Sequence, residues 1–148
     1  MKNKTTGTWL AFLGGPLGLH RFYLFGRGDW LGWLLPIPTV LGVYGLYRLK
    51  AFGVDDTISW VLLPVLGFVI AGCALNAIVY GLQTAEQWNA KFNPTAELEA
   101  DAGQTSWITI GAVVLSLLIG CTALLSGIAL SFQHYFEYQI AEGQKISQ

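Results

Sequence analysis

The sequence predicts an all-α polytopic membrane protein with four transmembrane helices, short connections and one polar loop. Three observations support this class. Of the 148 residues, 53% are hydrophobic and 11% are charged, against roughly 25% charged in a typical soluble domain. Four apolar runs are long enough to approach the ~30 Å hydrocarbon core of a bilayer. Tryptophans, whose rings favour the headgroup region, fall at or just beyond the ends of these runs. They are Trp9, Trp30, Trp33, Trp60, Trp88 and Trp107.

The first span is predicted from about Thr8 to Phe25, after a short polar start. A helix that stopped at Leu19 would rise only about 18 Å, so we expect it to continue. Pro16 lacks a backbone donor, which predicts a kink in an otherwise continuous helix. Gly14 and Gly18, four apart on one helical face, would let another helix come close. No small-residue cleavage site follows this run, so we expect the segment to be retained.

The second span is predicted from Trp30 to about Leu49 and contains Pro36 and Pro38. It follows a glycine-containing turn in which the charges of Arg27 and Asp29 are expected to be solvated. The two prolines interrupt hydrogen bonding at membrane depth, where freed carbonyls must be satisfied by neighbouring helices, side chains or water. We therefore expect this helix to be buried, or to line a cavity, on one side.

The third and fourth spans are predicted at about Ile58 to Leu82 and Trp107 to Phe132. Both lack charged residues and are long enough to cross with tilt. Small residues four apart recur in both, which predicts close antiparallel packing of the two helices. The pairs are Ala77 with Gly81, Ser116 with Gly120, and Ala123 with Gly127. Cys73 and Cys121 would lie on opposite sides of the midplane, so no disulfide is expected. Asn76 is the strongly polar residue inside the third span.

The loop at 83–106 is polar, and most of its charged residues are acidic. Asn93, followed by a proline, predicts the start of a short surface helix that Gly103 ends. Trp88 and Phe92, four apart, would share a helical face resting on the membrane surface. The acidic residues of the loop are Glu86, Glu97, Glu99 and Asp101.

Basic residues predict the orientation. With four crossings, five basic residues lie on the side of the amino terminus and three on the other, which favours both termini in the cytoplasm. The first set is Lys2, Lys4, Arg48, Lys50 and Lys145, and the second is Arg21, Arg27 and Lys91. We expect a helical hairpin at 1–52, a second hairpin at 53–148, a fraying tail after Phe132, and insertion in a bacterial inner membrane.

The segment at 14–23 reads Gly-Gly-Pro-Leu-Gly-Leu-His-Arg-Phe-Tyr. This pattern resembles the signature of the TM-two domain family, in which two short transmembrane helices are joined by a tight turn carrying Arg-Phe-Tyr. The resemblance covers roughly residues 2 to 50. The chain departs from the family where Phe25 precedes Gly26. It also lacks the tryptophan and aspartate usual near the end of the second helix at that spacing, where Tyr44, Tyr47, Arg48 and Lys50 stand instead. The resemblance implies a membrane adaptor or regulator with no agreed chemistry.

The sequence contains no recognisable catalytic or metal-binding pattern. His20 and His134 would lie on opposite sides of the membrane, and neither has partners at metal-ligand spacing. A net charge of -1 gives no basic footprint for nucleic acid. We therefore expect no enzyme activity, no cofactor and no nucleic-acid partner.

The leading hypothesis is a non-enzymatic integral membrane protein that acts as a helix-packing interaction or assembly module, surrounded by lipid. It would dock a partner helix or a second copy through its glycine faces and the Arg21 turn. The alternative is an oligomeric pore or small-solute transporter, since broken helices can expose carbonyls to a substrate. Arg21 could also have a purely structural role, capping the turn and reaching the headgroups. The candidate interaction residues are Gly14, Gly15, Gly18, His20, Arg21, Phe22, Tyr23 and Asn76.

Overall fold

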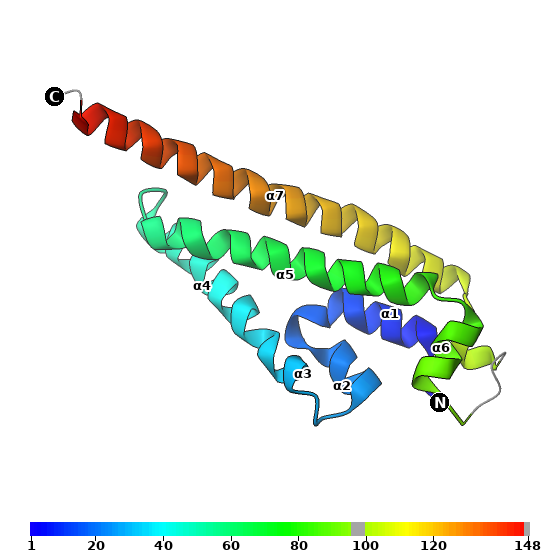
Figure 1. Ribbon diagram of the computed structural model, residues 1–148. Coiled ribbons are helices and arrows are strands. Elements are labelled where there is room, and N and C mark those ends of the chain that lie inside the picture. The colour runs from blue at the N-terminus through cyan, green and yellow to red at the C-terminus, as the bar shows by residue number, and fades with distance from the viewer. Residues whose placement is uncertain (96–99, 147–148) are drawn as a thin grey trace.

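A computed structural model describes residues 1–95 and 100–146, and within these ranges the regular structure is entirely helical. Two elements are short 3₁₀ turns, η1 and η2, and the rest are α-helices (Figure 1). In chain order they are α1 (Lys4–Leu13), η1 (Gly15–Leu17), α2 (Leu19–Phe25), α3 (Trp30–Leu34), α4 (Pro36–Phe52), α5 (Thr57–Leu82), α6 (Ala85–Phe92), η2 (Asp101–Gly103) and α7 (Trp107–Ile146).

The antiparallel pair of α5 and α7 forms the axis of the molecule (Figure 1). Small residues bring the two backbones together, as predicted. A Cβ atom added to Gly120 would lie 2.6 Å from the Cβ of Ala74, and one added to Gly67 would lie 2.8 Å from the carbonyl oxygen of Ala123. Both separations are far inside van der Waals contact, so larger residues at Gly67 or Gly120 would force the helices apart.

Helix α4 packs on the other side of α5, again through glycines. Added Cβ atoms on Gly42 and Gly45 would lie 2.5 and 2.6 Å from the Cβ atoms of Leu66 and Leu62. Among the described residues, three segments are long and apolar enough to cross a membrane: Trp30–Phe52, Thr57–Leu82 and Asp101–Ile146. The last two include the predicted third and fourth spans, and the first matches the predicted second.

The continuous first span predicted at Thr8 to Phe25 is absent. The chain instead forms α1, turns back through η1, and returns as α2 toward the end of the bundle where α1 began (Figure 1). The ten residues of α1 rise about 15 Å, half the thickness of a hydrocarbon core. This segment is therefore a short helical hairpin, and its interior at 14–18 is a turn where the sequence predicts a kink.

Helix α6 closes the amino-terminal end of the bundle. Trp88 and Phe92 share a face, as predicted, but that face is buried in a cluster with Ala11, Leu24 and Tyr80. The expectation that these rings lie on a membrane surface was wrong, because Trp88 is 0% exposed. Asn93 is the C-cap of α6 and does not begin a helix, since its N–H donates to the carbonyl of Asn89. Glu97 and Glu99 of the predicted surface helix lie outside the described residues.

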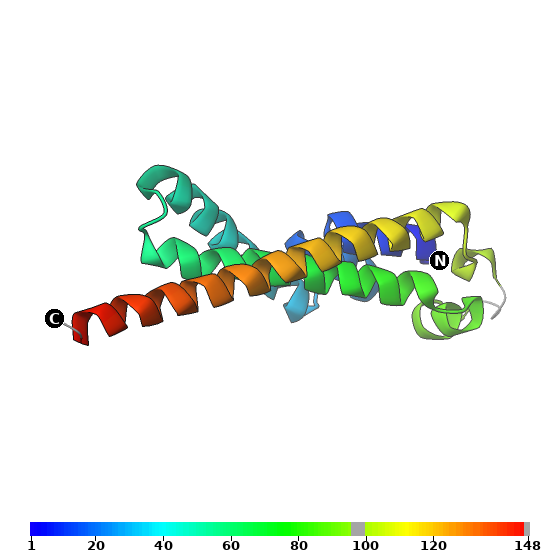
Figure 2. The same cartoon turned by 90° about the horizontal axis from the view of Figure 1, so that it is seen from above.

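Helix α7 continues to Ile146, well past the expected end at Phe132. Figures 1 and 2 show that the two chain termini lie at opposite ends of the bundle. The expectation that both termini share one side of a membrane rested on four crossings, whereas three segments of the described residues are long and apolar enough to cross. The side on which each terminus lies stays a prediction. Both cysteines carry free thiols, Cys73 buried and Cys121 exposed.

Candidate functional site

The glycine-rich segment forms a tight turn against the backbone of other helices. Gly14 is the C-cap of α1, and Gly18 takes the left-handed conformation at φ 74°. A Cβ on Gly15 would lie 2.6 Å from the Cβ of Cys73 in α5. A Cβ on Gly18 would overlap the carbonyl oxygen of Gly32 in α3. These glycines therefore pack inside the chain, and Gly14 and Gly18 do not form the exposed helical face that their spacing predicts.

Hydrogen bonds satisfy the backbone of this turn. The N–H groups of Leu17 and Leu19 both donate to the carbonyl of Gly14, at 3.2 and 3.0 Å. The hydroxyl of Thr39 in α4 donates to the carbonyl of Pro16 at 2.7 Å. These bonds satisfy backbone carbonyls that the interruption of the helix leaves without an intrahelical donor.

His20 is buried at the start of α2, with 1% of its surface exposed. Its ring centroid lies 6.2 Å from that of Tyr80, and Nδ1 has no hydrogen-bond partner among the residues that the structure describes. Burial, with a smaller contribution from the charge of Arg21 and against an opposing one from Asp29, lowers the pKa of His20 from 6.5 to about 4. The imidazole is therefore neutral at pH 7, as burial in an apolar cluster requires.

Arg21 forms a two-point ion pair with Asp29. Its Nε and one terminal nitrogen donate to the two carboxylate oxygens, and its guanidinium lies 4.7 Å above the Phe25 ring centroid. The hydrogen bond from Arg21 is the main cause that lowers the pKa of Asp29. The expectation that Asp29 is solvated was wrong. Arg27 is exposed, and its carbonyl accepts a hydrogen bond from the indole of Trp33.

The next two candidate residues also make contacts within the chain. The ring of Phe22 meets the Trp33 ring edge-on at 5.1 Å and covers Gly32. The hydroxyl of Tyr23 accepts a hydrogen bond from the backbone N–H of Asn3 at 2.8 Å. Phe22 therefore ties α2 to α3, and Tyr23 ties α2 to the amino terminus.

A polar network at the amino-terminal end was not predicted from sequence. Lys4 is 0% exposed, and its ammonium donates to the carbonyl of Gln83 at 2.8 Å and to the hydroxyl of Thr105 at 2.6 Å. Burial lowers its pKa. The Trp88 indole and the Asn93 amide both donate to the carbonyl of Lys2. This network fastens the first residues to α6 and to the segment before α7, which fixes the position of the hairpin.

The turn that holds Arg21 is repeated at the other end of α4. We call residues 15–33 the first corner and residues 42–60 the second corner. Arg48 donates to both carboxylate oxygens of Asp56 at 2.9 and 2.7 Å, and it lies 4.8 Å above the Phe52 ring centroid. The indole of Trp60 donates to the carbonyl of Val54 at 2.6 Å. Each of these residues lies 27 positions after its counterpart in the first corner.

The backbone also repeats between the two corners. A glycine follows the phenylalanine in each, with φ of 87° at Gly26 and 82° at Gly53. The shared pattern is Gly-x-x-Gly-Leu-[His/Tyr]-Arg-x-x-x-Phe-Gly-x-x-Asp-x-x-x-Trp, starting at Gly15 and at Gly42. The two corners lie at the two ends of the segment Trp30–Phe52 and overlap it. This internal repeat was visible in the sequence as a spacing, and sequence reasoning missed it.

Asn76 lies away from these residues. It is exposed on α5, and its amide nitrogen donates to the carbonyl of Gly72 in its own helix at 3.1 Å. The structure thus brings seven of the eight candidate residues together in one hairpin and leaves Asn76 on an outer face. Across residues 1–95 and 100–146, no three His, Cys, Asp or Glu side chains are grouped to hold a metal ion.

Comparisons with known proteins add no relative: no protein-family model, no curated protein and no solved structure matches this chain.

Proposed function

We propose that this chain is an integral membrane protein whose role is helix packing: it assembles with a partner helix or with a second copy and performs no chemistry of its own. One observation carries the proposal. The glycines and charges of the hairpin are used within the chain, whereas long apolar faces of α4, α5 and α7 are uncovered. Leu118 and Leu125 of α7, for example, are 64% and 65% exposed.

Membrane insertion is the natural setting for these faces. A soluble protein rarely exposes contiguous apolar surface of this extent, and three helices have the length and composition to cross. We propose three crossings, with the hairpin of α1 and α2 as a re-entrant element. Cys73, which meets the turn at Gly15, lies nine residues before the end of α5 at Leu82. The turn would thus reach about 13 Å along α5, near mid-membrane.

Three crossings imply termini on opposite sides. The hydrogen bond from Lys2 to Leu24 and the ring contact of Phe25 with Phe92 place the first corner at the amino-terminal end of the bundle. That end carries five basic residues and the other end three, which favours a cytoplasmic amino terminus. The five are Lys2, Lys4, Arg21, Arg27 and Lys91, and the three are Arg48, Lys50 and Lys145.

Cysteine labelling tests this topology. Single cysteines at the exposed Thr6 and Glu137, in a Cys121→Ala background, should react with an impermeant maleimide from opposite sides of sealed vesicles. Cys73 is buried and should stay unlabelled in intact membranes. Labelling of both positions from the same side would contradict three crossings, and release of the protein by alkaline carbonate would contradict membrane insertion.

Photo-crosslinking tests the assembly role. A photoreactive amino acid at Leu75 or Val79, both exposed on α5, should give a protein adduct of discrete mass in native membranes. A matched probe at the buried Leu24 should give none. Adducts with lipid alone at every exposed position would contradict the proposed role.

The pore or transporter alternative remains a prediction. It was motivated by the broken helices, and at one such break Thr39 already satisfies the carbonyl of Pro16. Solute or ion flux through reconstituted vesicles that Asn76→Leu alters would support this alternative over the assembly role.

A further inference from the structure

One face of α5 lies uncovered between α4 and α7 and runs along most of the helix. Its residues are spaced three or four apart, so they share one side of the helix. Phe68 and Val79 on this face are 45% and 49% exposed. Gly72 lies at its centre, and an added Cβ there would meet no atom within 4 Å. The face consists of Val65, Phe68, Gly72, Asn76 and Val79.

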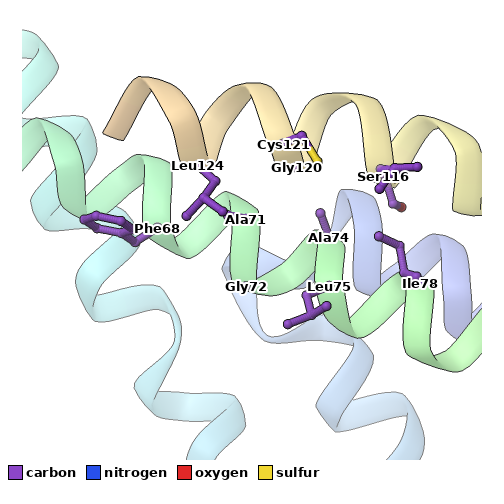
Figure 3. A pocket seen from close by; sticks show the side chains of 11 residues that line it. Phe68, Ala71, Gly72, Ala74, Leu75, Ile78, Ser116, Gly120, Cys121 and Leu124 are labelled. Carbon is purple, nitrogen blue, oxygen red and sulfur yellow. The ribbon is translucent and has the colours of Figure 1, made fainter. Parts of the chain in front are cut away.

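Two apolar grooves flank this face. On the α7 side a groove of about 380 Å³ runs past Phe68, Gly72 and Leu75 (Figure 3). On the side of α3 and α4 a groove of about 360 Å³ is lined by Val65, Phe68, Gly72 and Asn76. Phe68 and Gly72 border both grooves. The surface of α5 at Gly72 therefore has a groove on each side, and each groove can accept side chains of another helix.

Asn76 makes this face chemically distinctive. The exposed amide has one hydrogen bond within the described residues, to the carbonyl of Gly72 one turn earlier. An amide carries two N–H donors and an acceptor oxygen with two lone pairs, so most of its hydrogen-bonding capacity is unused. Lipid tails offer no partner, and polar side chains of membrane helices therefore hydrogen-bond across helix interfaces.

We propose that a second copy of this chain docks here, with the α5 helices of the two copies crossing at Gly72 and Asn76. The proposal rests on the assembly role proposed above and names the surface and the occupant. The argument for a second copy is charge complementarity. Across a two-fold axis the partial positive N–H of each Asn76 faces the partial negative oxygen of the other, so one residue supplies both halves of the pair.

The geometry of Gly72 fits such a crossing. A small residue one turn before a polar one lets two backbones approach closely enough for short side chains to reach across. Both copies have the same orientation in the membrane, so the axis runs along the membrane normal and the contact is isologous. Phe68 and Val79 then pack above and below the crossing and exclude lipid from the amides.

The decisive experiment measures dimerisation in lipid vesicles by energy transfer between labelled copies, as the protein-to-lipid ratio is varied. The wild type should dimerise. Gly72→Leu should raise the dissociation constant at least roughly tenfold, and Asn76→Leu roughly three- to tenfold, in the range of interhelical hydrogen bonds in membranes. Asn76→Gln, which keeps the amide, should retain most of the affinity.

Gly111→Leu is the matched control. Gly111 lies on α7, and an added Cβ there also meets nothing within 4 Å. Both substitutions replace an open glycine in a long helix by leucine, so a folding effect common to both would appear in both. The proposal requires Gly72→Leu to dissociate the dimer and Gly111→Leu to leave it unchanged.

Crosslinking provides an independent readout. In a Cys121→Ala background, Val79→Cys should form a disulfide-linked dimer on mild oxidation, whereas Leu118→Cys on α7 should not. A dimer that forms equally well with Gly72→Leu and Asn76→Leu would overturn this surface and leave the assembly role standing. A monomeric protein that still captures another membrane protein would also overturn this surface and leave the assembly role standing. A monomer that captures no protein would overturn both.

Discussion

Gly18 and Gly32 meet backbone to backbone: a methyl group on Gly18 would overlap the carbonyl oxygen of Gly32. Gly18 also has φ of 74°, a region that residues with a Cβ rarely adopt. Two independent constraints thus apply at one position, one local and one from α3. Together they turn the chain back after α1 and hold α2 against the rest of the bundle.

Gly18→Ala should destabilise the fold by more than about 1 kcal/mol. A strained backbone conformation alone costs about 1–3 kcal/mol, and the overlap with Gly32 adds to that cost. Thermal unfolding in detergent measures the change. Gly28→Ala is the control, since a Cβ at Gly28 meets nothing within 4 Å and its φ is not positive. Equal melting temperatures for Gly18→Ala and the wild type would show that the turn is not held as described.

Acid should destabilise the protein through His20. Because its pKa falls from 6.5 to about 4 on folding, the unfolded chain binds more protons between those values. Stability from this residue is complete above pH 6.5 and is lost as pH falls toward 4, up to about 3 kcal/mol. Melting temperatures measured across this range should fall with pH, and the fall should be smaller in His20→Gln.

His134→Gln is the matched control for the loss of a packed imidazole. The His134 ring stacks on Trp60 near the opposite end of the bundle, at 5.9 Å. Comparison of the two variants at pH 7 measures what each ring contributes to stability through its contacts alone. If instead His20→Gln and the wild type lose stability in parallel, another group carries the acid sensitivity.

The two repeated corners should make equivalent contributions. Arg21→Gln and Arg48→Gln should each lower the melting temperature by a few degrees, because each leaves a partly buried aspartate without its partner. Replacement by lysine should not restore the loss, since an ammonium cannot make the two-point contact. Arg27→Gln, at an exposed arginine in the first corner, should have no effect. Unchanged stability in Arg48→Gln would mean that the second corner is a resemblance without a structural role.

Sequence reasoning succeeded where a local pattern decides the outcome. The apolar runs that become α5 and α7 are long enough to predict helices from composition alone, and the small residues along them predicted their close pairing. Gly120 against Ala74 is one such contact. The pattern works because a residue without a large side chain permits close approach whichever helix comes near.

Sequence reasoning failed where contacts with a distant segment decide the local structure. A proline that follows two glycines and stands two residues before a third is compatible with either a kink or a reversal. Contacts with Cys73, Gly32 and Thr39 select the reversal. The burial of Trp88 depends in the same way on α1, whose Gly7 leaves room for the indole. An added Cβ on Gly7 would lie 2.6 Å from that ring. None of these contacts is encoded within a window of neighbouring residues.

The repeated corner is a different case, because its signal is local and was present in the sequence. Sequence reasoning makes Arg21 a candidate interaction residue, whereas Arg48 enters it only as one of the basic residues that predict the orientation. Comparison of the chain with itself at a shift of 27 positions aligns both arginines, both phenylalanines and both aspartates. The ion pairs could have been predicted from that alignment.

The stack of Trp60 on His134 marks the last ring contact between α5 and α7 toward the carboxyl end. From residue 135 to Ile146 the helix continues for twelve more residues, a rise of about 18 Å. Rigid rods of this kind act as spacers. A reporter protein attached at the end of the helix would lie about that far beyond the stack of Trp60 on His134 along α7, and deleting whole turns would shorten the reach in steps of about 5 Å.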